Sequence, residues 1–75
     1  MSLPALQVQD AIAALDCAIR SLESAARSLE LADIDPDLKT LPKGQMDAGR
    51  SAALYARGIA RDALLNLSVR SAAAG

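Results

Sequence analysis

A heptad pattern of large apolar residues constrains the fold of this chain more than any other feature. These residues are Val8, Ile12, Leu15, Ile19, Leu22 and Leu29, and with Ala26 between the last two the positions recur in alternating steps of four and three. An α-helix places residues with this spacing on one face, and that face needs a second helix to cover it. The pattern therefore predicts a long helix that packs against another along most of its length.

A second stretch repeats the spacing with smaller side chains. Its positions are Met46, Gly49, Ala53, Ala56, Ala60, Ala63 and Leu67. Tyr55 is the single aromatic residue, and alanine and leucine, which are strong helix formers, supply most of the apolar content. Aromatic and β-branched residues, which favour strands, are scarce. We therefore predict an all-α protein.

Proline and glycine divide the chain between these two stretches. Pro36, Pro42 and Gly44 predict a loop over about 33–44, and Asp35 is placed to cap a short helical turn after it. The helices are then expected over about 4–32 and about 45–70, with a frayed end beyond. Because the helices match in length, we predict a single domain, 1–75, folded as a two-helix antiparallel hairpin.

The chain has 75 residues, and alanines leave it few bulky groups for a core. Small domains bury a small share of their surface and are often completed by oligomerisation. We therefore expect the hairpin to dimerise into a four-helix bundle. The expected oligomer core contains the larger residues of the first pattern and the smaller ones of the second: Val8, Ile12, Leu15, Ile19, Leu22, Leu29, Ala53, Ala56, Ala60, Ala63 and Leu67.

The first helix has two further faces. One carries only small residues, again at heptad spacing: Ala11, Ala14, Ala18, Ser21, Ala25, Ser28 and Ala32. The other is charged, and its Asp16–Arg20 and Glu23–Arg27 combinations have the i,i+4 spacing of intrahelical ion pairs. We expect this charged face to satisfy itself and to be solvated.

The second helix has mixed character on the side opposite its alanines. A stripe of arginine and leucine is predicted there as the partner-binding surface: Arg50, Leu54, Arg57, Arg61 and Leu65. A helix that is partly apolar on two sides is usually contacted on both. A solvated face with scattered leucines, or a phosphate-binding face extended by Arg70, are the alternatives.

Candidate chemistry is sparse. The chain has no histidine, the commonest general base and metal ligand, and no nucleophile–base pair can be proposed. Asp33, Asp35 and Asp37 resemble the start of a calcium loop, but Leu38 stands where that loop needs glycine. Cys17, without a disulfide partner in the chain, is expected as a small core residue. We expect no enzymatic activity, no cofactor and no metal.

These features predict a non-enzymatic protein–protein interaction module, an adaptor, chaperone-like or regulatory hairpin that acts as a homo-oligomer. The expected partner is a second copy of the chain, and another protein is considered as an additional partner. The net charge of −1 and the lack of a long apolar run argue against nucleic acid and membrane. The lone Cys17 indicates a reducing compartment, and we expect the cytoplasm. A nucleic-acid-binding regulatory dimer with an arginine face, or a structural subunit of a larger assembly, are the alternative functions.

Overall fold

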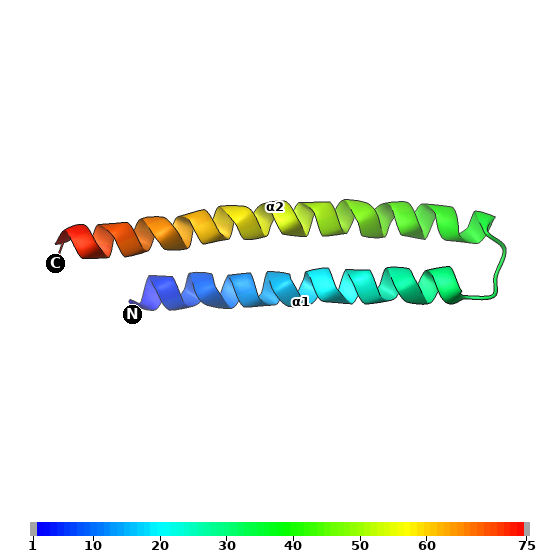
Figure 1. Cartoon of the computed structure of the whole chain (residues 1–75), viewed down its shortest axis with the longest axis horizontal. Coiled ribbons are helices and arrows are strands. Elements are labelled where there is room, and N and C mark those ends of the chain that lie inside the picture. The colour runs from blue at the N-terminus through cyan, green and yellow to red at the C-terminus, as the bar shows by residue number, and fades with distance from the viewer. Residues whose placement is uncertain (1, 75) are drawn as a thin grey trace.

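Two long helices form the whole architecture. The computed structural model describes residues 2–74, with the side chains of residues 2–70. Helix α1 spans Leu3–Leu31 and helix α2 spans Asp37–Ala74, and the two run antiparallel, side by side, joined by a short loop (Figure 1). Residues 2–74 contain no strand. The predicted all-α hairpin is confirmed.

The ends of the helices are set by local hydrogen bonds. Ser2 is the N-cap of α1, and its Oγ accepts a hydrogen bond of 3.4 Å from the N–H of Ala5. Asp35 caps α2, since its Oδ1 accepts a hydrogen bond of 3.0 Å from the N–H of Asp37. At the end of α1, the Nζ of Lys39 donates to the carbonyl of Glu30 at 2.8 Å. The cationic side chain satisfies a carbonyl of the last helical turn, where positive charge is favourable.

The predicted loop over 33–44 is wrong in extent. The helical turn that Asp35 caps does not stop, because α2 begins at Asp37 and continues through Pro42. A proline within a helix deprives the carbonyl four residues earlier of its donor, here that of Leu38. Leu38 is largely exposed, so water can take the place of that donor. The proline is therefore tolerated this close to the start of the helix.

The predicted end of the second helix is also wrong. α2 does not end near Arg70 but continues to Ala74, through residues expected to fray. Three consecutive alanines, the residue with the highest helix propensity, support this extension. Gly75 lies outside the described residues. The end of α2 consequently projects past the start of α1 (Figure 1).

The core of the hairpin is a thin seam between the helices. Among the described side chains, only two hydrophobic residues are buried, Ala5 at 7% and Ile19 at 4% exposure. Ala5 lies three residues before Val8 and so extends the heptad pattern of α1 by one step. The molecule measures 60 × 15 × 12 Å, with a radius of gyration of 17.3 Å. A compact domain of this length would have a radius near 11 Å, so this rod has no room for a central core.

Candidate functional site

One edge of the hairpin is a ladder of ion pairs between the helices. Asp16 pairs with Arg57 at 2.7 Å, Glu23 with Arg50 at 3.5 Å, and Glu30 with Lys43 at 3.4 Å. From each pair to the next, the α1 residue advances by seven positions and the α2 residue falls back by seven. The acids all come from α1 and the bases all from α2, as in the flanking positions of an antiparallel coiled coil. We call these six residues the charged edge.

The charged edge corrects the expected pairing within the first helix. The acids at positions 16 and 23 were expected to pair with Arg20 and Arg27, one turn away. Instead, each reaches across to an arginine of α2. An acid of α1 can reach a base one turn along its own helix or a base on the facing helix. The base on the facing helix lies nearer the seam, and an acid that turns toward the seam is less exposed to solvent. The charged face of α1 is therefore an interhelical contact, and it is not satisfied within one helix.

Among the three acids of the charged edge, Asp16 makes the shortest ion pair. The Nη1 of Arg57 donates a hydrogen bond to its Oδ1, and that bond lowers the pKa of Asp16 below its ordinary value of 3.8. Partial burial opposes this effect, and the positive charges of Arg57, Arg61 and Arg20 reinforce it. Asp16 is thus ionised wherever the protein is near neutral pH.

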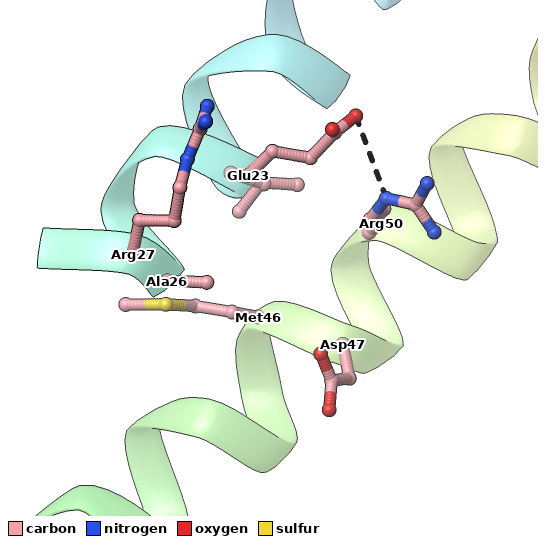
Figure 2. A pocket seen from close by; sticks show the side chains of 7 residues that line it. Glu23, Ala26, Arg27, Met46, Asp47 and Arg50 are labelled. Atoms are coloured by element: carbon pink, nitrogen blue, oxygen red, sulfur yellow. Dashed lines mark ion pairs between the residues drawn. The ribbon is translucent and has the colours of Figure 1, made fainter. Parts of the chain in front are cut away.

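A shallow groove of about 400 Å³ opens beside the middle pair of the ladder. Figure 2 shows Glu23 extending from α1 toward Arg50 of α2, with Met46 beside Ala26 below them. Glu23 and Arg50 neutralise each other, whereas Arg27 and Asp47, which also line the groove, make no ion pair among the described side chains. The groove therefore combines one ion pair with a further acid and a further base.

The residues predicted as a partner-binding stripe do not form one free outer face. Arg50 and Arg57 are engaged with α1 through the charged edge. Leu54 is half-buried, and Arg61 and Leu65 are exposed and make no ion pair among the described side chains. The sequence placed the whole stripe on the side of α2 opposite its alanines, and this placement is wrong for Arg50 and Arg57. The reason is that residues flanking the seam of a coiled coil can reach the facing helix with long side chains.

The residues predicted as an oligomer core lie mostly between the two helices of one chain. Ile19 is buried, and nearly all the others are half-buried. Gly49 lies in this seam, and an added Cβ there would meet Leu22 Cδ1 at 3.6 Å. Ala63 is exposed, whereas the adjacent Leu64 is half-buried. A helix with 3.6 residues per turn drifts away from a strict heptad, which moves the seam by one residue at this end.

The opposite edge of the hairpin is apolar and uncovered. On α1 it consists of the small-residue face described above, most of whose members are exposed. On α2 the matching positions contain large side chains: Tyr55 is 74% exposed, Leu41 73% and Ile59 53%. We call this surface the apolar edge. It comprises the small-residue face of α1 together with Leu38, Leu41, Ala48, Ala52, Tyr55 and Ile59 of α2.

Sequence patterns indicate only half of the apolar edge. The α1 half is a regular heptad, but its α2 counterpart is interrupted by Gln45 and mixes large with small residues. Its signal is the recurrence of Ala48, Ala52, Tyr55 and Ile59 in steps of four, three and four. That recurrence runs parallel to the stronger alanine pattern of the same helix and is easily assigned to it.

Two other candidates from the sequence have plain structural positions. Cys17 is exposed on α1, so its prediction as a core residue is wrong. It falls outside the seam because it follows Asp16, which already belongs to the charged edge. Among the aspartates of the loop, Asp35 serves as the cap of α2.

Comparison of the chain with family models, with curated proteins and with solved structures finds no match. Within residues 2–74, neither helix has a segment apolar enough, over a sufficient length, to cross a bilayer. The fold and site together define an antiparallel helical hairpin with one charged edge and one apolar edge.

Proposed function

We propose that this chain is a non-enzymatic protein–protein interaction module that acts as a homodimer, with two hairpins forming a four-helix bundle. The observation that carries the proposal is its accessible surface of 5546 Å². A folded monomer of 7.7 kDa is expected to expose about 4300 Å². The excess exceeds the roughly 800 Å² that each partner buries in a standard interface.

The thin core supports the same proposal. A hairpin in which Ile19 is the single large buried side chain among residues 2–70 has little hydrophobic stabilisation to offset the entropy of ordering its chain. A second hairpin would cover apolar side chains that are now exposed or half-buried. The lack of histidine, and of any nucleophile–base pair in the sequence, supports a binding role over a catalytic one.

Sedimentation equilibrium across nanomolar to high-micromolar concentrations tests this proposal. We expect a mass twice that of one chain at micromolar concentration, and a melting temperature that rises with concentration, because association stabilises the fold by mass action. A monomer at micromolar concentration with a sharp, concentration-independent melting transition would overturn it.

A further protein partner is proposed for the part of the arginine–leucine stripe that makes no ion pair with α1, which lies on the side of α2 near the charged edge. Leu54 and Leu65 supply apolar area, and Arg61 supplies a planar cation of the kind enriched at interfaces. The double change Leu54→Ser with Leu65→Ser should keep the helicity and the dimer but remove capture of this partner. If capture by the double variant equals that of the wild type, the stripe is only solvated surface.

The alternative of a nucleic-acid-binding dimer is less well supported. Two of its arginines, Arg50 and Arg57, already pair with carboxylates of α1, which would have to be displaced by phosphate. The alternative predicts binding that weakens steeply with added salt, whereas a leucine-centred protein contact should change little. Titration of a fluorescent duplex at two salt concentrations separates the two.

A further inference from the structure

We infer that the apolar edge is the surface on which a second copy of this chain docks, and that the charged edge faces away from the dimer interface. This inference rests on the proposed homodimer and adds the surface and the residues that form it. The edge holds the most exposed large side chains in the middle of α2, Tyr55 and Ile59. They have no covering partner within one hairpin.

The apolar edge is neutral along its central length. The small-residue face of α1 carries no charged residue between positions 11 and 32. The matching positions of α2 from Leu38 to Ile59 carry none either, and Gln45 is their only strongly polar residue. An isologous dimer brings the same patch of both copies together, so like charges on that patch would repel. A neutral patch avoids this repulsion.

The charged edge is a poor surface for a second copy. Its carboxylates and cations already neutralise one another within the hairpin, and burying them would cost their hydration without providing new partners. Arg61 and Arg20 make no ion pair among the described side chains and lie close enough to Asp16 to act on its pKa, so they add positive charge at this side. Two copies meeting there would place like charges together. The distribution of charge thus selects the apolar edge.

The dimensions of the apolar edge suit a dimer. Residues 11–32 of α1 cover about 32 Å of helix, and two adjacent helices are about 20 Å wide. A flat surface with these dimensions has an area of about 600 Å². Protruding side chains increase this area toward the roughly 800 Å² that each partner buries in a standard interface. The small residues of α1 allow close approach, and Tyr55 and Ile59 of the other copy fill the space above them. The tyrosine hydroxyl can stay at the wet rim.

Two variants of equal charge change provide the central test. Ala48→Glu with Tyr55→Glu adds two negative charges to the apolar edge at exposed positions, so the contacts between α1 and α2 are kept. Arg61→Gln with Leu65→Glu makes the same change in net charge on the side near the charged edge. By sedimentation equilibrium, we expect the first variant to raise the dimer Kd at least about a hundredfold and the second to leave it within about threefold.

A second measurement on the unmodified protein covers the case in which the apolar-edge variant fails to fold. Tyr55 is the only aromatic residue, so it is the sole source of intrinsic fluorescence. On dilution through the dimer dissociation, we expect quenching of Tyr55 by acrylamide to increase about twofold, since the residue is uncovered in the free hairpin.

The outcomes separate the two proposals. If the wild type is a dimer but the Arg61–Leu65 variant dissociates and the Ala48–Tyr55 variant does not, the docking surface is wrong while the homodimer stands. Quenching that stays constant while the mass halves would likewise overturn the docking surface alone. A wild type that is monomeric at every concentration overturns both.

Discussion

The Nη1 of Arg57 lies 2.7 Å from the Oδ1 of Asp16, although the two residues are 41 positions apart in the sequence. This is the shortest of the three ion pairs, and its side chains are the least exposed, at 26% and 32%. A short, partly covered charge-assisted hydrogen bond is stronger than an exposed one. The pair therefore joins the middle of α2 to the middle of α1.

A dependence of stability on pH follows from Asp16. Its pKa in the folded protein is lower than 3.8, chiefly because of the hydrogen bond from Arg57. The unfolded chain binds more protons in acid, so this contribution is complete above pH 3.8 and is lost as the pH falls through the lower folded value. In Asp16→Asn, urea denaturation at a series of pH values should show a smaller loss of stability in that acidic window.

The control for this experiment is Asp10→Asn. Asp10 is an exposed acid of α1 that makes no ion pair among residues 2–70. Its variant should follow the wild-type profile. An unchanged acid profile in Asp16→Asn would show that the pair with Arg57 does not persist in solution.

The three pairs of the charged edge should differ in their contributions to stability. The side chains of Lys43 and Glu30 are 54% and 65% exposed, so their attraction is screened by water and salt. Lys43→Gln should lower the free energy of unfolding by less than about 1 kcal/mol, with the effect vanishing in high salt. Arg57→Gln should cost more than Lys43→Gln. Chemical denaturation of both variants in low and high salt checks this order, which equal costs would contradict.

Ile19 should be the most sensitive single position of the seam. It is the only large side chain that is buried among those described, and removal of its outer carbons leaves a cavity between the helices. Ile19→Ala should therefore lower the free energy of unfolding by about 2–5 kcal/mol. Leu65→Ala, at an exposed position, should change it by less than about 0.5 kcal/mol. Similar midpoints for the two variants in thermal melts would show that the seam is not the core.

The glycines of α2 should be replaceable by alanine with a gain in stability. Gly58 has nothing within 4 Å of the position that a Cβ would take. Gly58→Ala should raise the free energy of unfolding, measured by urea denaturation, by about 0.5–1 kcal/mol, because alanine loses less backbone entropy in a helix.

Gly49→Ala extends this test into the seam. Its Cβ would lie at van der Waals distance from Leu22, so the substitution should also stabilise the hairpin. A loss of stability in Gly49→Ala alongside a gain in Gly58→Ala would indicate that the helices must approach more closely at Gly49 than the hairpin shows.

Periodicity is sufficient to predict the helices and the seam, but not the contacts between them. The large residues of α1 can satisfy their pattern only by facing another helix, so the hairpin follows from local information. The partner of Asp16 does not follow from local information, because Arg20 and Arg57 are both suitable bases. The choice depends on the register of α2, and that register depends on where the loop ends. Pro42 and Gly44 favour a loop over residues that are in fact helical, which hides the matching spacing of the three pairs.

The uniform seven-residue spacing of the charged edge has a consequence for how the hairpin keeps its alignment. If α2 slid by one heptad, Asp16 would face Arg50 and Glu23 would face Lys43, so two of the three pairs would form again. Charge alone therefore only weakly distinguishes neighbouring alignments. The slide would move α2 by about 10 Å along α1 and take Gly49 away from Leu22, beside which it lies in the seam. The unequal side chains of the seam thus set the alignment that the charged edge leaves open.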